Sequence, residues 1–184
     1  IKFVKKANPT AGEDYTPVHT FEDFDVNPLI KTNLSAKGYT IPSPIQDKTI
    51  KVGLEGKDVI GVANTGTGKT AAFAVPILNK LINSRSSRAL IIAPTRELAQ
   101  QIEQECKSIA KGSGLTGAIL IGGANISPQL RDLRANPSIV IGTPGRIKDH
   151  IERGSLKLNA FDNVVLDEVD RMLDMGFIHD IRRI

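Results

Sequence analysis

Two short polar runs contain the residue types that handle phosphate groups and metal ions. The first covers residues 63–70 (ANTGTGKT), and the second covers residues 167–170 (DEVD). Each follows an apolar segment rich in β-branched residues, over 58–62 and 164–166, and such segments are typical of buried parallel strands. The first run can form a turn that surrounds phosphates, and the carboxylates of the second run can hold Mg²⁺. Together the two runs predict hydrolysis of a nucleoside triphosphate.

The run 63–70 fits the phosphate-loop pattern of Gly, four residues, then Gly-Lys-Ser/Thr, except that Ala63 stands at the first position. Its glycines let backbone N–H groups turn toward a phosphate, and the helix expected to follow adds its dipole. Lys69 would then reach the outer phosphates, and the Thr70 hydroxyl would bind Mg²⁺. A glycine-rich strand-to-helix turn without a ligand is the alternative. The predicted nucleotide-binding residues here are Asn64, Thr65, Gly66, Thr67, Gly68, Lys69 and Thr70.

The acidic run has the composition of a magnesium and water site. Mg²⁺ prefers a carboxylate combined with waters and phosphate oxygens, so Asp167 and Thr70 are the predicted metal ligands. Glu168, beside Asp167, is predicted to orient or deprotonate the attacking water. The predicted catalytic residues are therefore Lys69, Asp167 and Glu168. The alternative for the carboxylates alone is an ordinary acidic helix start.

The elements that must position these runs alternate along the chain. Strands are expected over 58–63, 89–93, 116–121, 138–141 and 163–167. Helices are expected over 27–37, from 44 to about 53, and over 68–82, 96–111, 126–134, 145–152 and 168–175. Such alternation predicts an α/β domain, in which a parallel sheet has helices on both faces.

Size and composition narrow the classes of protein further. The chain has 184 residues, which suits one domain, and its net charge of +4 permits nucleic acid as a partner without requiring it. The single cysteine, Cys106, excludes an internal disulfide, is expected to be buried, and fits a reducing, cytoplasmic compartment. The longest apolar run, 71–78, is far shorter than the roughly 20 residues that span a bilayer.

A third motif connects the two runs to a known family. Residues 38–46 (GYTIPSPIQ) resemble the glutamine motif of DEAD-box RNA helicases. With 63–70 and 167–170 in the same order, the chain from about residue 20 to residue 184 resembles the N-terminal RecA-like domain of that family. The resemblance implies a RecA-like P-loop fold, ATP and Mg²⁺ as cofactors, and RNA as the partner.

The resemblance also implies how adenine is recognised. Gln46 would bond the adenine edge, since an amide can give one hydrogen bond and accept one. Phe21, 17 residues before the motif, would stack on the ring, and Tyr39 stands in the motif where Phe is common. From the residues alone, an exposed helix position is the favoured interpretation of Gln46. Phe21 and the nearby Phe24 are each also compatible with a place in the core.

Three short segments, each after an expected strand, are the candidates for RNA contact. They are 94–99 (PTRELA), 122–123 (GG) and 143–146 (TPGR), and the resemblance implies that they hold the sugar-phosphate backbone of a single strand. Hydroxyl, glycine N–H and guanidinium groups suit phosphates but read no bases, which predicts weak sequence selectivity and strong salt dependence. Singly, each segment is also typical of a capped helix start. The predicted RNA-binding residues are Pro94, Thr95, Arg96, Gly122, Gly123, Thr143, Pro144, Gly145 and Arg146.

The chain departs from the family pattern in two ways. Val169 replaces the usual Ala, and the family's Ser-Ala-Thr motif and second RecA-like domain, with its arginine finger, are expected beyond residue 184. We therefore expect a flexible arm over 1–20, a partial domain over 21–184, and nucleotide binding with little turnover. We also expect 58–63 and 163–167 to lack a hydrogen-bonded neighbour, unless a longer chain or a second chain supplies one.

Two other functions are compatible with these motifs. One is a nucleotide-binding or RNA-binding module that regulates a partner without turnover. The other is a helicase-like ATPase that acts on DNA, which the glutamine motif disfavours because that motif is specific to the RNA family. RNA-stimulated ATP hydrolysis distinguishes the helicase from both.

Overall fold

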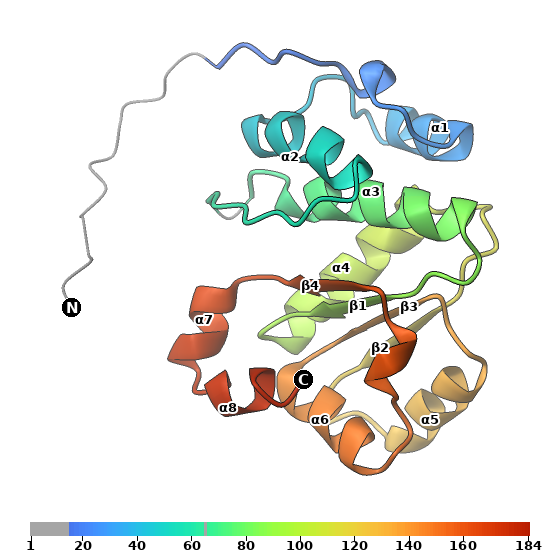
Figure 1. The fold of residues 1–184 in the computed structure, drawn as a ribbon, viewed down its shortest axis with the longest axis vertical. Helices are drawn as coiled ribbons and strands as arrows, with labels where there is room; N and C mark the ends of the chain where they lie inside the picture. The colour runs from blue at the N-terminus through green and yellow to red at the C-terminus, as the bar shows by residue number, and fades with distance from the viewer. Residues whose placement is uncertain (1–14, 65) are drawn as a thin grey trace.

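The fold is a four-stranded parallel sheet between two layers of helices, seen in a computed structural model that describes residues 15–64 and 66–184. The strands lie in the order β2-β3-β1-β4 (Figure 1). Their bounds are Ala89–Ile92 (β1), Gly117–Leu120 (β2), Ile139–Gly142 (β3) and Asn163–Leu166 (β4). The helices are η1 (Phe21–Asp23), α1 (Pro28–Ala36), α2 (Pro44–Leu54), α3 (Lys69–Asn83), α4 (Arg96–Ile109), α5 (Ile126–Arg134), α6 (Pro144–Glu152), η2 (Leu158–Ala160), α7 (Val169–Asp174) and α8 (Ile178–Ile181).

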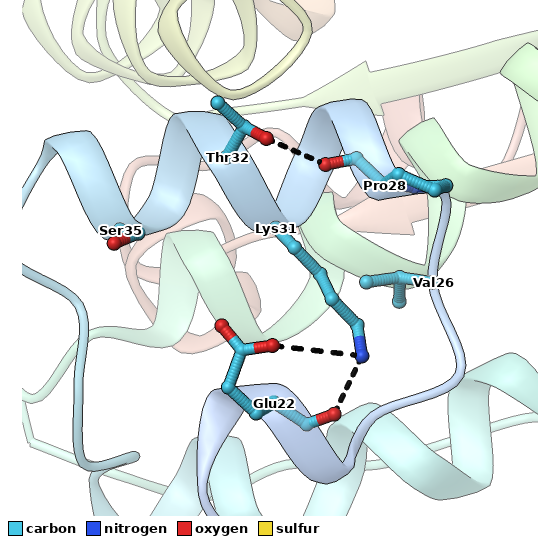
Figure 2. Close-up of a pocket in the computed structure, with 6 residues that line it drawn as sticks. All are labelled: Glu22, Val26, Pro28, Lys31, Thr32 and Ser35. Carbon is cyan, nitrogen blue, oxygen red and sulfur yellow. Dashed lines mark hydrogen bonds and ion pairs between the residues drawn. The ribbon is translucent and has the colours of Figure 1, made fainter.

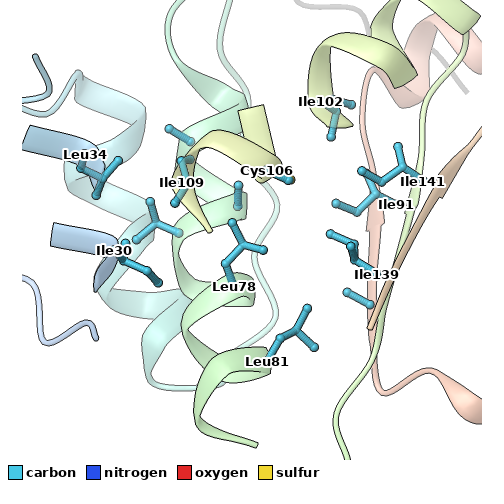
Figure 3. Packing of buried hydrophobic residues seen from close by; sticks show 14 of the residues in the cluster. Ile30, Leu34, Leu78, Leu81, Ile91, Ile102, Cys106, Ile109, Ile139 and Ile141 are labelled. Atoms are coloured by element: carbon cyan, nitrogen blue, oxygen red, sulfur yellow. The ribbon is translucent and has the colours of Figure 1, made fainter. Parts of the chain in front are cut away.

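Alternating strand residues build two separate cores, one on each face of the sheet. Ile91 of β1 contributes to the core under α1, α3 and α4, which Figure 3 shows from close by. Its neighbours Leu90 and Ile92 point to the opposite core, which α6 and α7 cover. This period of two is what a strand buried on both faces requires, and it confirms the predicted sheet with helices on both faces.

Cys106 lies in the first core, on the inner face of α4. It is 4% exposed, and burial raises the pKa of its thiol to about 12. The predicted burial of Cys106 is thus confirmed. Among the described residues, none of the helices has the length and apolar character needed to cross a membrane.

Local signals position the first two long helices. Pro28 stands at the first position of α1, and the Asn27 side chain accepts a hydrogen bond from Leu29 N at 3.0 Å. Ser43 and Gln46 form a capping box at the start of α2. The structure places both helices within a residue of the predicted bounds, because caps and prolines are read from the local sequence.

The predicted buried strand over 58–63 is wrong for this structure. Residues 57–64 form no strand, and Ile60 and Val62 are 98% and 92% exposed. β4 is an edge strand, and two of its apolar side chains, Val164 and Leu166, are exposed. A β-branched run becomes a strand only where a neighbour supplies hydrogen bonds and covers its side chains, and the described residues supply none beside 58–63.

The structure contradicts the expected flexible arm over 1–20 in its last few residues. Residues 1–14 lie outside the described residues, but the segment 15–19 is bound to Asp47 in α2. The Asp47 carboxylate accepts hydrogen bonds from Tyr15 Oη (2.5 Å), Val18 N (2.8 Å) and the backbone and ring nitrogens of His19 (3.2 and 2.6 Å). Burial opposes ionisation of Asp47, but these hydrogen bonds outweigh it and lower the pKa to about 2.

We predict that Asp47→Asn lowers the free energy of unfolding near neutral pH by about 1–3 kcal/mol, because an amide NH₂ would face donors. The Asp47 pKa falls from 3.8 unfolded to about 2 folded. The carboxylate therefore stabilises the fold above pH 3.8, and this contribution disappears as the pH falls through about 2. Urea denaturation across this acid range measures both effects.

The control is Asp25→Asn, since Asp25 is exposed. We expect this variant to keep the acid dependence of the parent protein. If Asp47→Asn and Asp25→Asn follow the same pH profile, Asp47 does not anchor the segment 15–19.

Candidate functional site

The loop 63–68 leads into α3 and leaves the first turn of that helix available to an anion. Gly66 and Gly68 have φ angles of +82° and +85°, which favour glycine. Gly68 is also the N-cap of α3, and it has no side chain to accept from the first-turn N–H groups. Thr67 Oγ1 donates to Asn64 O at 2.7 Å and closes the loop. Helix N-termini of this kind bind phosphate. Thr65, which was also predicted to bind the nucleotide, lies outside the described residues.

The start of α2 holds this loop through two side chains. Ser43 Oγ donates to Thr67 O at 2.6 Å, and Gln46 Nε2 donates to Gly68 O at 3.1 Å. The Gln46 carbonyl accepts from Ser43 N at 2.8 Å. Gln46 is thus 4% exposed and is not the exposed helix residue of the alternative interpretation. The capping box and the contact of Gln46 with the loop 22 residues away are both findings of the structure.

The hydrogen bonds that hold Gln46 do not exhaust its amide group. A primary amide has two N–H donors and two carbonyl lone pairs. Within the described part of the chain, Gly68 O takes one donor and Ser43 N takes one lone pair. One donor and one acceptor remain, which is the capacity that the adenine edge requires.

Phe21 was expected to stack on adenine, and the structure buries its ring instead. Phe21 is 4% exposed and packs edge-to-face against Phe24 and Tyr39, with ring centroids 5.8 and 5.3 Å away. In this conformation little of the Phe21 ring is open to a ligand. Tyr39 Oη donates to Glu105 at 2.9 Å, and burial, with this hydrogen bond, raises its pKa to about 12. These aromatic side chains therefore belong to the hydrophobic core that α1, α3 and α4 cover.

The acidic run begins where β4 ends. Asp167 N donates to Ile92 O at 2.9 Å, so the residue still continues the sheet ladder. Asp167 is 8% exposed, and its pKa is raised by burial and by Glu168, while the charge of Lys69 opposes the shift. The Lys69 ammonium therefore acts on Asp167 across the space between α3 and β4. A bound divalent cation would favour the ionised carboxylate in the same way.

Glu168 has an uncommon backbone conformation. Its φ and ψ angles are +50° and +52°, the left-handed region, which costs a non-glycine residue roughly 1–2 kcal/mol. Glu168 N donates to Asp167 Oδ1 at 3.0 Å, and its carboxylate pairs with Arg171 at 3.1 Å. Strain of this kind is concentrated at functional sites, where the surrounding structure maintains it.

The donor set is suited to Mg²⁺ rather than to a protein-caged metal. In the described residues, no group of three or more His, Cys, Asp or Glu side chains could hold a metal ion. Mg²⁺ does not require such a group, because it retains waters and binds one or two carboxylates together with phosphate oxygens. Asp167 offers a buried carboxylate, and Thr70 lies in the first turn of α3, so these two residues stay the predicted Mg²⁺ ligands.

The predicted RNA-binding residues meet at the same edge of the sheet. Because all strands are parallel, the segments after β1, β2 and β3 lie side by side. The Arg96 guanidinium lies against the α-carbon of Gly123, and Arg146 Nη1 and Nη2 each lie 3.4 Å from Ala124 O. Thr95 accepts from Leu98 N at 3.2 Å and caps α4. Pro94, Thr143 and Pro144 are buried, Gly122 is partly exposed and Gly145 is exposed.

One surface hollow lies away from these residues. It has a volume of about 510 Å³, it lies between η1 and α1, and Lys31 crosses it to Glu22 (Figure 2). None of the predicted site residues lines it. Its two charged groups already pair with each other, so we assign it no ligand.

Comparison with known proteins places this geometry in a family context. The family model described as DEAD/DEAH box helicase matches residues 43–184. The ATP-dependent RNA helicase CshA of Listeria monocytogenes is 50% identical over 165 residues, covering 89% of this chain and 32% of that protein. The ATP-dependent RNA helicase DeaD of Buchnera aphidicola is 48% identical over 167 residues, covering 90% of this chain and 28% of that protein. The chain thus spans about a third of the length of these curated relatives.

Solved structures agree with the fold described above. A crystal structure of a DEAD box protein from the hyperthermophile Methanococcus jannaschii matches with a TM-score of 0.84 at 40% identity, covering 89% of this chain and 45% of that one. A crystal structure of a hypothetical ATP-dependent RNA helicase from Sulfolobus tokodaii matches with a TM-score of 0.79 at 37% identity, covering 85% of this chain and 45% of that one. The predicted RecA-like α/β fold is confirmed.

We predict that Gly68→Ala destabilises the protein more than Gly66→Ala. Both positions have a positive φ, which costs alanine roughly 1–2 kcal/mol. At Gly68 a Cβ would also overlap Gln46 Nε2, whereas at Gly66 it would meet nothing within 4 Å. Loss of the Gln46 hydrogen bond adds about 1 kcal/mol at Gly68. Urea denaturation of both variants provides the measurement, and equal losses would show that Gln46 does not hold the loop.

Proposed function

Since this chain belongs to the DEAD/DEAH box helicase family, we propose that it is the ATP-binding domain of an ATP-dependent RNA helicase. Such an enzyme couples ATP binding and hydrolysis to the unwinding or remodelling of RNA. One observation carries the proposal for this chain: Gln46 donates to Gly68 O at 3.1 Å. This bond joins a residue suited to an adenine edge to a loop suited to phosphates.

In this proposal four residues have separate roles in ATP hydrolysis. Lys69 binds the outer phosphate oxygens, and Thr70 and Asp167 hold Mg²⁺, which when bound neutralises charge on those phosphates. Glu168 orients a water molecule and takes its proton as the water oxygen attacks the terminal phosphorus, releasing ADP and phosphate. The pKa of Asp167, raised by burial, supports a site that is completed by a cation.

The RNA strand would lie across the loops that follow β1, β2 and β3. Arg96 and Arg146 supply guanidinium groups, and Gly122, Gly123 and Gly145 let the backbone approach phosphates closely. Contacts of this kind position a strand without reading its bases, so we propose binding with weak sequence preference.

The complete enzyme would include more than these residues. The matched relatives are about three times as long as this chain, so we propose that residues 21–184 work with a second RecA-like domain. That domain would supply an arginine finger and the other half of the RNA clamp. Residues 1–184 alone would then bind nucleotide and turn it over slowly, because an arginine finger contributes about 10³–10⁵ in rate.

We predict that the full-length protein hydrolyses ATP faster in the presence of single-stranded RNA. Lys69→Ala or Glu168→Gln lowers kcat by about 10²-fold or more, since each removes a group that acts on the transition state. The matched control is Lys107→Ala, at the far end of α4, which we expect to retain the parent rate. A phosphate-release assay measures all three. Turnover that neither site change reduces would reject the site, and absence of any turnover would favour a regulatory module.

We predict that Gln46→Ala lowers the preference for ATP over GTP by about tenfold, because it removes both hydrogen bonds to the adenine edge. Equilibrium binding of labelled ATP and GTP measures the preference, and thermal unfolding measures the separate loss of the Gly68 contact. A variant that loses stability but keeps the parent preference would remove Gln46 from adenine recognition.

A further inference from the structure

Three polar side chains form a hydrogen-bonded row between α5, α6 and the turn after α6. His150 is fully buried, and Gln129 is 5% exposed. His150 Nε2 lies 3.3 Å from Gln129 Oε1, and His150 Nδ1 lies 2.8 Å from Ser155 Oγ. Gln129 Nε2 continues the row by donating to Ile121 O at 3.1 Å and Asn125 O at 3.2 Å. None of these side chains was singled out by the sequence.

The direction of each hydrogen bond follows from the donors available. Gln129 uses its NH₂ group for two carbonyls, so its Oε1 faces His150 and can only accept. His150 must therefore hold a proton on Nε2. Burial, followed by the charge of Arg146, lowers the pKa of His150 and favours the neutral ring. Ser155 Oγ also lies 3.0 Å from His150 O, but that carbonyl already accepts from Ser155 N at 2.9 Å and Leu156 N at 3.1 Å. The single hydroxyl proton of Ser155 can therefore go to Nδ1 of the neutral ring, which accepts it.

The far end of the row holds the loop that follows β2. Ile121 O and Asn125 O lie on either side of Gly122, Gly123 and Ala124, and Gln129 binds both. Gly123 has a φ of +73°, and two consecutive glycines give this loop little stiffness of its own. Arg96 lies against Gly123 and Arg146 against Ala124 O, so both guanidinium groups depend on where this loop lies.

We propose that His150 and Gln129 are positioning residues for nucleic-acid binding: His150 orients the Gln129 amide, and Gln129 fixes both ends of the loop 122–124 that faces the phosphate backbone. This inference rests on the proposed RNA-binding function. A loop held in its binding conformation before the ligand arrives loses less entropy on association, which raises affinity without adding a contact.

Two substitutions at His150 separate this role from packing. In His150→Gln, the amide nitrogen stands the same number of bonds from Cβ as Nε2 and still donates to Gln129. In His150→Asn, it stands at the place of Nδ1, faces Ser155 and leaves Gln129 Oε1 without a donor. The measurement is the Kd of the full-length protein for fluorescein-labelled single-stranded oligouridylate, with Mg²⁺ and a non-hydrolysable ATP analogue, followed by fluorescence anisotropy.

We expect His150→Gln to bind within about twofold of the parent protein and His150→Asn to bind about 3- to 10-fold more weakly, while both keep the parent affinity for ADP. A purely structural role would lower thermal stability in both variants and leave the two RNA affinities equal, which overturns the inference. A parent protein that binds no oligouridylate overturns the proposed function itself.

A measurement on the unchanged protein covers the case in which a variant does not fold. Long-range ¹H–¹⁵N spectra report which ring nitrogen of His150 holds the proton. We expect the neutral ring with its proton on Nε2 from about pH 6.5 to about pH 8. A proton on Nδ1 alone would leave Gln129 without a donor and would overturn the inference.

Discussion

The parallel direction of all four strands is the constraint on which the candidate site depends. It brings every strand-to-helix junction to one edge of the sheet, where α4, α5, α6 and α7 begin. The sheet ladder extends into these junctions: Ala93 N donates to Gly142 O, and Thr143 N donates to Leu120 O. The backbone just beyond these strands is therefore still fixed by hydrogen bonds of the sheet. A site assembled from such positions needs few direct contacts among its own members.

The same edge concentrates features that are unfavourable for stability alone. Asp167 is buried next to Glu168, and Glu168 occupies the left-handed region of backbone space. The buried hydrophobic residues on both faces of the sheet offset such local costs. The raised pKa of Asp167 and the opposing influence of Lys69 describe a place where an added positive charge would be favourable.

Local patterns predicted most of the fold, and non-local contacts explain what they missed. Caps and apolar periodicity placed the helices within about two residues, because those signals lie inside each helix. The run 58–63 has the composition of a strand but lacks a partner, and partners are not encoded locally. The burial of Phe21 and the attachment of residues 15–19 to Asp47 are likewise long-range. For the candidate site, the order of strands and helices in the sequence predicted which segments meet at the sheet edge. It did not predict the hydrogen bonds that hold these segments there.

The phosphate loop illustrates why those hydrogen bonds matter. Its preceding segment makes no strand, so the loop is held from two other directions: by α3, which it begins, and by Ser43 and Gln46 of α2. The amide that holds Gly68 O still has one donor and one acceptor unassigned among the described contacts. A base that uses this remaining capacity would immobilise Gln46 further, and through it the loop that faces the phosphates. Base and phosphate recognition would then stabilise each other through one side chain, because each reduces the freedom that the other must overcome.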